Sequence, residues 1–485
     1  MPPAPPPDLP AAVAALLGED ESLWLPAAVA IRKAVSAHDD APLQAVVDLG
    51  ALPPLVALLS RDDLPELQVE AAWICCNVAS GGSDACASVV AAGALAPAIS
   101  HLGASGVQLR EQVAWLLANV AGESELHRDA CLEAGVVGPL MAALEAEVEA
   151  APLRQQAWVL RNLLHRRPRS LEVVRAVLPG LSRLVPRLED SEALTEALWA
   201  ASAAAEEDPD RVAAAAAPAA ARAAELLDTS APVAVLLPAA RLLGGLAIGS
   251  EAATQAVVDT GVLAGGFRAL LAGPRAGAGP REGTADAQVP AAPPPMTEAE
   301  ESQLLKEVCF TLSNIAAGTL AQAQAVVDAG LVPALAAVYD RCSDHGVHTE
   351  ATYALSNLAT AEGAPPELPL AVLAGGGAQR LAAYLRDSAG PGPEGRGKAQ
   401  RAAAEGLLAI ARAGDAEASA TLYGMMDVYH DLVAALSHAD ADAGGEGDGL
   451  QPEVVGLLQE LLDGWDMPPA PGGQSGAAKD ADEKS

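Results

Sequence analysis

The chain has 485 residues, of which 51% are hydrophobic and only 3% aromatic, and its formal net charge is −34 at pH 7. So acidic a chain lacks the basic surface that nucleic acid or an anionic membrane requires in a direct partner. No apolar run is long enough to cross a bilayer, and the N-terminus has no secretion-signal pattern. The six cysteines do not suggest a disulfide framework, so we expect a reducing compartment, the cytoplasm or the nucleus.

An aromatic residue precedes every asparagine of this chain by four positions. Four residues are about one helical turn, so each pair lies on one face of a helix. Asn is a mediocre helix former, and an alanine-rich chain could avoid it. Aromatic rings can clamp side chains and the amide can bind main-chain groups, so we expect the pairs to hold an extended peptide. The five pairs are Trp73/Asn77, Trp115/Asn119, Trp158/Asn162, Phe310/Asn314 and Tyr353/Asn357.

The positions of these aromatic residues recur every 41 to 43 residues between residues 73 and 199. Glycines between short apolar stretches keep the same spacing, namely Gly50, Gly93, Gly135, Gly261, Gly330 and Gly376. We predict a unit of a short helix, a glycine break, a second helix and a third helix that carries the pair. The first such third helix should begin at Pro65, and Gly81, Gly122 and Gly318 should mark the ends of third helices. A period near 42 residues is typical of armadillo and HEAT repeats.

These repeats predict an all-α fold, an armadillo-repeat right-handed superhelical solenoid of about ten three-helix repeats whose third helices line one concave surface. We expect this domain to span residues 11–465. The distance from Arg241 to Phe310 exceeds one period by 27 residues, and residues about 273–299 are rich in Gly, Pro and Ala. We therefore expect a flexible insertion there. Residues 1–10 and 466–485 have compositions typical of disorder.

Catalytic and metal-binding patterns give no support to an enzyme. The chain contains no P-loop, GxSxG or HExxH pattern. His345 and His348 have a metal-like spacing, but no cluster of Cys or carboxylates completes a site. We therefore expect no catalytic residue, no metal and no cofactor.

The repeats resemble those of the importin alpha family, armadillo adaptors that bind nuclear localisation signals. The segments "LSRDDLPELQVEAAWICCNVASG", "REQVAWLLANVAGES" and "LLKEVCFTLSNIAAGTLAQAQAVVDAGLVPAL" are similar to the second, third and seventh repeats of that family. The similarity runs from about Leu9 to Trp465. The resemblance implies an adaptor that moves between cytoplasm and nucleus and binds a Lys/Arg-rich peptide of cargo proteins, antiparallel to the superhelix.

The resemblance also implies two peptide sites. In the major site, Glu123 stands where the family has an aspartate that pairs with the key lysine of the cargo. The implied major-site residues are Trp73, Asn77, Gly81, Gln112, Trp115, Asn119, Glu123, Trp158, Asn162, Glu196 and Trp199. The minor site is eroded, because Phe and Tyr replace tryptophans and Gly245 stands where an asparagine is expected. The implied minor-site residues are Arg241, Glu251, Phe310, Asn314, Glu350, Tyr353 and Asn357.

The N-terminus departs from the family, which begins with a basic segment that binds importin beta. The first basic residues here are Arg32 and Lys33, so importin beta is a doubtful partner. Either the chain is a cargo binder that cannot recruit the carrier by the usual route, or the sequence is truncated. An acidic stretch near the C-terminus is a candidate contact for an export factor. The alternative function is an armadillo scaffold that binds other basic protein segments without acting in import.

Overall fold

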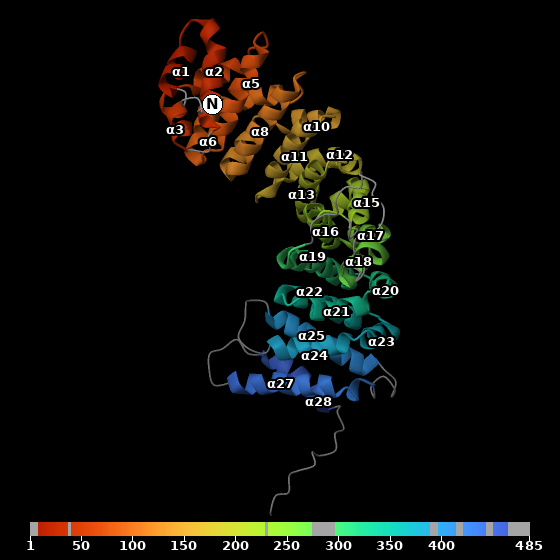
Figure 1. The fold of residues 1–485 in the computed structure, drawn as a ribbon. Helices are drawn as coiled ribbons and strands as arrows, with labels where there is room; N and C mark the ends of the chain where they lie inside the picture. Colours follow the sequence, from red (N-terminus) through yellow and green to blue (C-terminus); the bar gives the residue numbers. More distant parts are fainter. Residues whose placement is uncertain are drawn as a thin grey trace, which may run out of the picture. The chain divides into compact units, whose positions relative to one another are not determined.

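The computed structural model describes residues 8–36, 40–227, 231–273, 296–388, 396–413, 421–442 and 450–463. Every regular element within these ranges is a helix (Figure 1). The prediction of an all-α fold is therefore confirmed. By their internal contacts the helices form two compact units, Met1–Glu350 and Ala351–Ser485.

The first unit begins with α1 (Leu9–Leu16) and α2 (Glu21–Val35). Three repeats of three helices follow, in the order that the sequence predicts. They are α3 (Asp40–Asp48), α4 (Leu52–Leu58) and α5 (Pro65–Ala79), then α6 (Ser83–Ala91), α7 (Leu95–Ser100) and α8 (Val107–Glu123), then α9 (Glu125–Glu133), α10 (Val137–Ala146) and α11 (Ala150–His165).

The next repeat has two helices instead of the predicted three. A single helix, α12 (Leu171–Arg187), precedes α13 (Ser191–Glu207). The three-helix pattern then resumes, with a π-helical segment η1 in place of a regular start to one second helix. These helices are α14 (Pro209–Ala215), α15 (Ala217–Leu226), α16 (Val233–Ala247), α17 (Glu251–Asp259), η1 (Leu263–Phe267), α18 (Arg268–Ala272), α19 (Glu298–Ala316), α20 (Leu320–Asp328), α21 (Val332–Arg341) and α22 (His345–Thr360).

Left-handed glycines separate first from second helices, as predicted. All six glycines named from the sequence have positive φ, from 69° at Gly330 to 86° at Gly93. A side chain would be strained in this conformation, whereas Gly adopts it freely. The repeat that contains α12 has a glycine too, Gly180, but it lies inside the helix. A Cβ there would come within 2.0 Å of the Cε of Met141 on α10, so this glycine serves close packing.

One predicted helix end is wrong. Gly81 and Gly318 lie just beyond α5 and α19, but Gly122 lies inside α8, which continues to Glu123. Ser124 then adopts an extended conformation, and its Oγ accepts a hydrogen bond from the backbone N–H of His127. A serine in this role caps the next helix, so α9 starts without a glycine turn.

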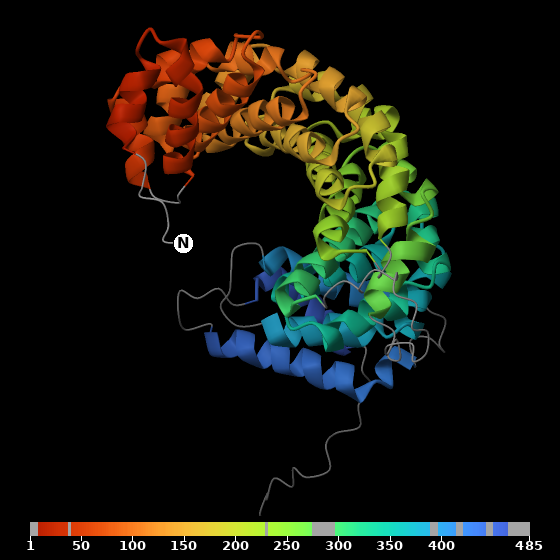
Figure 2. The same cartoon turned by 45° about the horizontal axis from the view of Figure 1, so that its top comes forward.

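The third helices of the first unit pack side by side in chain order, α5, α8, α11, α13, α16 and α19 (Figure 2). Leucines such as Leu116 and Leu160 are fully buried between the helices. Many other buried positions on these helices are alanines, and small side chains allow close approach. This stack holds the aromatic–Asn pairs of the first unit at regular intervals.

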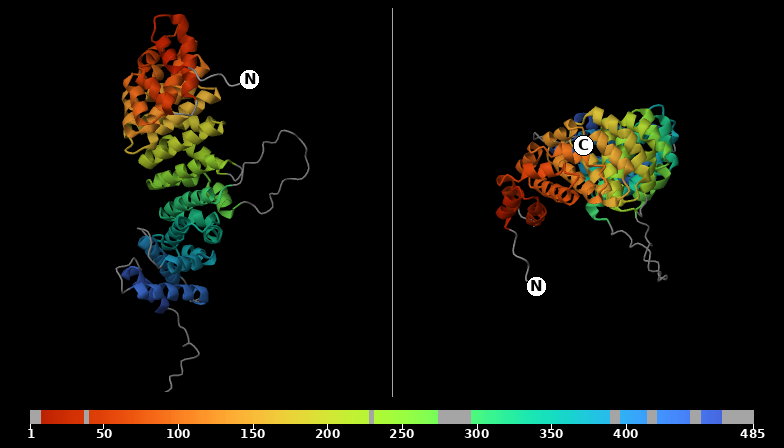
Figure 3. Two further views of the ribbon diagram at one scale, coloured as in Figure 1. Left: turned by 60° about the vertical axis from the view of Figure 1, so that its left-hand side comes forward. Right: turned by 90° about the horizontal axis from the view of Figure 1, so that it is seen from above.

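The second unit starts within α22. It continues with α23 (Glu367–Ala374), α24 (Gly377–Ser388), α25 (Arg396–Ala413), α27 (Met426–Asp442) and α28 (Pro452–Asp463). α24 packs against both α25 and α27, and α28 packs against α25 (Figure 3).

Two expected boundaries shift. Leu9 and Pro10 belong to α1, whose first turn is capped by the carboxylate of Asp8, so the helical region begins before residue 11. Residues 298 and 299 belong to α19, which starts with a capping box between Thr297 and Glu300. The rest of the expected insertion, except for residues 273, 296 and 297, and the whole expected C-terminal tail lie outside the described residues.

Across the described parts of the chain, no single helix is long and apolar enough to cross a membrane. One pair of helices, α20 with α21, passes the same test on length and composition alone, with a bend of 67° at its break.

Candidate peptide-binding site

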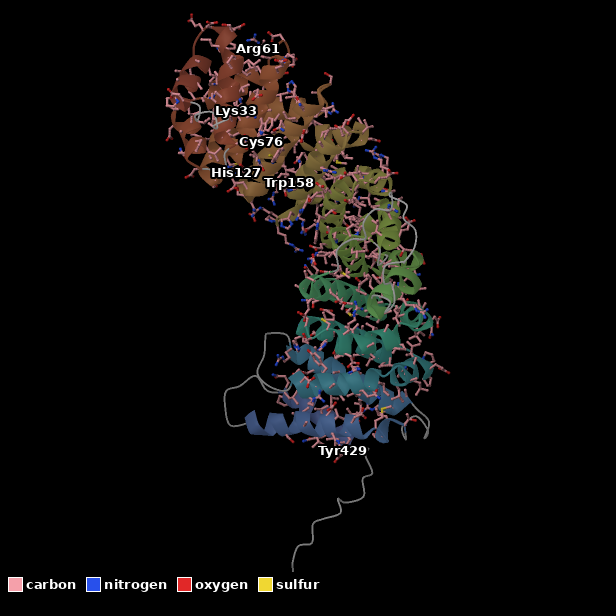
Figure 4. All side chains as sticks on the ribbon, in the orientation of Figure 1. Lys33, Arg61, Cys76, His127, Trp158 and Tyr429 are labelled. Atoms are coloured by element: carbon pink, nitrogen blue, oxygen red, sulfur yellow. The ribbon has the colours of Figure 1, made fainter. Side chains whose placement is uncertain are left out.

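Three neighbouring third helices carry the tryptophan–asparagine pairs: α5, α8 and α11. None of the three tryptophans belongs to the buried core, and Trp115 is the most open, at 36% exposed. Figure 4 labels Trp158, on α11. The structure therefore brings together, on packed neighbouring helices, the rings that the sequence predicts for the major site.

The asparagine amides are held in defined orientations. Nδ2 of Asn119 donates to the carbonyl oxygen of Cys76 on α5 at 3.1 Å, and Nδ2 of Asn162 donates to that of Ala118 on α8 at 2.9 Å. Nδ2 of Asn77 donates to the carbonyl of Trp73 in its own helix at 3.0 Å. No described residue donates a hydrogen bond to Oδ1 of these three side chains, so each presents an acceptor.

A pocket of about 410 Å³ opens beside two of the tryptophans. Its lining comes from α8, α11 and α13 and from the start of α16. The residues include Trp115, Trp158, Gln155, Thr195 and Glu196. The aromatic walls and the two polar side chains suit an aliphatic stem, whereas the two carboxylates that line the pocket, Glu192 and Glu196, are already paired with Arg154 and Arg161.

Glu123 ends α8, one turn beyond Asn119. No described residue forms an ion pair with its carboxylate. It lies near the buried thiol of Cys86, where burial first, and then the charge of Glu123, raise the pKa of the thiol to about 12. The only basic side chain that bonds to Glu123 among the described residues is Arg166, whose Nη2 donates to the backbone oxygen at 3.3 Å, so the carboxylate itself has no described ionic partner.

Two arginines that the sequence analysis did not select occupy the outer tryptophans. The guanidinium carbon of Arg32 lies 4.6 Å from the ring centroid of Trp73, and its Nε lies 2.6 Å from Glu70. That of Arg161 lies 5.6 Å from the ring of Trp199. The repeat spacing could have revealed Arg32, which precedes Trp73 by 41 residues.

Two predicted site residues have unexpected surroundings. Gln112 is only 5% exposed, and its buried Oε1 accepts no hydrogen bond from any described residue. It therefore lies within the helix stack and not on an open surface. Gly81 is exposed, and a Cβ at this position would come within 2.9 Å of the Leu43 side chain.

Residues 39–80 and 321–360 match the armadillo/beta-catenin-like repeat family. The chain is 34% identical over 326 residues to importin subunit alpha-1a of Oryza sativa subsp. japonica, which covers 67% of this chain and 57% of that protein. It is 38% identical over 195 residues to importin subunit alpha-2 of Arabidopsis thaliana, covering 40% and 36%. The chain belongs to the importin alpha family.

This importin alpha family member spans about half the length of the curated relatives that it matches. Among solved structures it is similar to the crystal structure of an engineered protein, with a TM-score of 0.72 and 25% identity. That similarity covers 95% of this chain and 99% of the other.

Beyond Trp199, the importin alpha-like helices are tied together by a network around Glu206. Its carboxylate accepts from Arg167 at 3.3 Å, from Arg169 at 3.2 Å and from Arg241 at 3.0 Å. Burial acts to raise the pKa of Glu206, but Arg241 and Arg169 outweigh it and lower the pKa. Arg241 also lies 2.8 Å from Glu307, whose pKa is raised because its burial outweighs the attraction of Arg241. Arg241, predicted for the minor site, is thus paired with two carboxylates of this chain.

The asparagine that the family has after this arginine could not be placed here without rearrangement. Gly245 is buried, and a Cβ on it would lie 3.1 Å from the Cβ of Ala205 and 3.4 Å from the backbone nitrogen of Glu206. The missing amide therefore reflects tight packing of α16 on α13.

The other predicted minor-site residues fall in both units. In the first unit, Nδ2 of Asn314 donates to the carbonyl of Phe310 at 2.8 Å, and Glu350 accepts from Ser313 at 3.5 Å. Burial raises the pKa of Glu350, although Lys306 acts to lower it. Glu251 is exposed in the first turn of α17. In the second unit, half-buried Tyr353 and Asn357 stand one turn apart on α22.

The histidine pair does not form a metal site. His348 stacks on the ring of Tyr339 with centroids 4.5 Å apart, and its Nε2 lies 2.6 Å from the carbonyl oxygen of Cys342. Within the described ranges, no three His, Cys, Asp or Glu side chains are grouped so that they could hold a metal ion.

Proposed function

We propose that this chain is a nuclear import adaptor that binds Lys/Arg-rich nuclear localisation signals of cargo proteins across α5, α8 and α11. The observation that carries this proposal is the row of partly exposed tryptophans, each followed one turn later by an asparagine whose Oδ1 accepts from no described residue. The relatives reported above carry the name importin subunit alpha.

An extended peptide satisfies this arrangement in three ways. Its main-chain N–H groups donate to the Oδ1 atoms of the asparagines, which accept from no described residue, while one N–H of Nδ2 in Asn119 and in Asn162 holds the amide in place. The stems of long side chains pack against the indole faces. A lysine ammonium pairs with the carboxylate of Glu123, which forms no ion pair with a described residue. The net charge of −34 attracts a basic peptide before contact.

The test is fluorescence anisotropy with a labelled basic peptide. Replacing Trp115 or Asn119 by Ala should cost about 1–3 kcal/mol of binding free energy, the range for hot-spot and hydrogen-bond truncations. Glu123→Gln should weaken a lysine-containing peptide but not its norleucine analogue, which keeps the stem without the charge. Trp24→Ala is the matched control, because Trp24 bonds to Gly18 and lies off the row. Unchanged affinity in a triple Ala variant of Trp73, Trp115 and Trp158 would refute the proposal.

Peptide binding alone does not distinguish an import adaptor from a scaffold for other basic segments. The distinguishing assay is nuclear accumulation of a cargo in permeabilised cells, with this chain added with and without importin beta. Accumulation that depends on both proteins supports import. Peptide binding with no accumulation under any condition favours the scaffold.

We further propose that the minor site is the weaker of the two. Arg241 forms ion pairs with Glu206 and Glu307, and Gly245 has no side-chain amide that could bind the peptide backbone. A bipartite peptide should therefore gain less than about tenfold over its own major-site half, because few new hydrogen bonds form. Calorimetry on the two peptides measures this ratio, and a gain of a hundredfold or more contradicts it.

A further inference from the structure

We infer that Arg161 determines specificity: its guanidinium occupies the place of a cargo cation at Glu196 and Trp199, and so ends the row of cation subsites at Trp158. This inference rests on the proposed function, because it concerns which side chains of a bound basic peptide are read.

Arg161 is placed to act as an internal ligand. It lies on α11 three residues after Trp158, so it shares a helical face with that ring. Its side chain crosses to α13, where Nη1 lies 3.0 and 3.1 Å from the two carboxylate oxygens of Glu196. The guanidinium also lies over the Trp199 ring. A carboxylate together with an indole face is the environment that a peptide arginine or lysine would need.

The part of the row that contains Trp115, Trp158 and Glu123 lacks both features in the described ranges: its rings carry no cation, and its carboxylate has no ion pair. Among the described residues, no cation lies over Trp115 or Trp158, and no ion pair involves Glu123. The 410 Å³ pocket opens beside these two rings. A ring and a carboxylate are therefore available on one side of Arg161 and occupied on the other.

The segment after Arg161 supplies further arginines that bond to acceptors of this chain. Arg167 and Arg169 pair with Glu206, and Nη2 of Arg166 donates to the carbonyl oxygen of Gly122 at 2.8 Å. A further basic residue of the cargo would meet these positive charges and would find both acidic groups already paired. We therefore expect a short basic core to reach the full affinity of the site. An additional lysine that points toward α13 should not increase that affinity.

The experiment compares five peptides: a basic core, the core with one Lys added at its N-terminus or at its C-terminus, and the same two extensions made with Ala. Binding is measured by anisotropy to the full chain and to Arg161→Ala. In the unaltered chain, Lys and Ala extensions should bind within about twofold of each other. In the variant, the Lys extension at one end should bind about five- to tenfold more tightly than Ala, the gain of one ring-stacked, ion-paired cation.

The controls separate this effect from general charge and from folding. Arg183→Ala removes one positive charge from an exposed pair with Glu145 and should leave the Lys-to-Ala ratio unchanged. Arg161→Lys keeps a cation and should behave as the unaltered chain, with circular dichroism reporting folding. An equal ratio in all variants overturns the inference while core binding upholds the proposed function. Failure of the core itself to bind overturns both.

Discussion

Glu147→Gln should loosen the contact between the two helices that carry Trp115 and Trp158. The side chain of Glu147, the C-cap of α10, is 3% exposed; it pairs with Arg110 of α8 and accepts from Nε2 of Gln156 on α11 at 3.3 Å. Its carboxylate accepts from Nε of Arg110 at 2.7 Å and from Nη2 at 3.0 Å. The backbone N–H groups of Val148 and Glu149 donate to it at 3.1 Å each.

The size of the effect follows from what the variant leaves behind. Removing one partner of a buried ion pair costs about 3–5 kcal/mol, because the other charge stays buried and unpaired. Arg110 retains the carbonyl oxygens of Ala104 and Ser105, at 2.8 and 3.1 Å, and the new amide keeps one acceptor. We therefore expect a loss of about 2–4 kcal/mol in the local free energy of unfolding.

The loss should depend on pH in a defined direction. Burial acts to raise the pKa of Glu147, but Arg110 and the backbone donors outweigh it and hold the pKa below 4.5. A lowered pKa contributes stability that is present above the unfolded value and lost as the pH falls through the folded value. The difference between the unaltered chain and the variant should therefore shrink below about pH 4.5.

Hydrogen exchange of the α8 and α11 amides measures this locally, which suits a repeat protein whose neighbours unfold separately. Exchange in the variant should be faster by about thirtyfold to a thousandfold at pH 7. The matched control is Glu145→Gln, since Glu145 and its partner Arg183 are 60% and 58% exposed and should contribute less than about 1 kcal/mol. Equal protection in both variants, or a difference that grows at low pH, would refute the reasoning.

Two further outcomes are expected. Gly122→Ala should reduce affinity for a basic peptide about tenfold without loss of helicity, since the new Cβ would lie 2.8 Å from Nδ2 of Asn162 and displace its amide; unchanged affinity in anisotropy would count against a role for that amide. Glu350→Gln should remove a loss of stability that the unaltered chain shows as the pH rises through the raised folded pKa of Glu350. Thermal midpoints between pH 4 and pH 8 test this, and parallel curves for the two proteins would contradict it.

The local features of the fold could be predicted because they depend on nearby residues. A glycine between apolar stretches gives a left-handed turn at Gly50 and at its five equivalents, and Pro65 starts α5 as expected. The one-turn spacing of Trp and Asn placed each pair on one helical face. These predictions needed only backbone preferences and helical periodicity.

The departures involve contacts between repeats, which spacing alone does not determine. Gly180 lies inside α12 instead of at a helix break, and it packs closely against Met141 of the neighbouring α10. Arg161 and Arg32 fill the positions of expected ligands because the stack brings a carboxylate and a ring from the next helix within reach. The direction of a long side chain between helices depends on three-dimensional packing, which the order of residues does not reveal.

The bonds from Asn119 to the Cys76 carbonyl and from Asn162 to the Ala118 carbonyl couple recognition to the rigidity of the stack. When a peptide N–H donates to Oδ1 of such an amide, the amide becomes more polarised and its Nδ2 a stronger donor. Each bound residue then tightens the junction between two successive repeats. Binding at one Trp/Asn pair should thereby favour the distance between helices that binding at the next pair requires. The helix stack should become stiffer as the peptide docks along it.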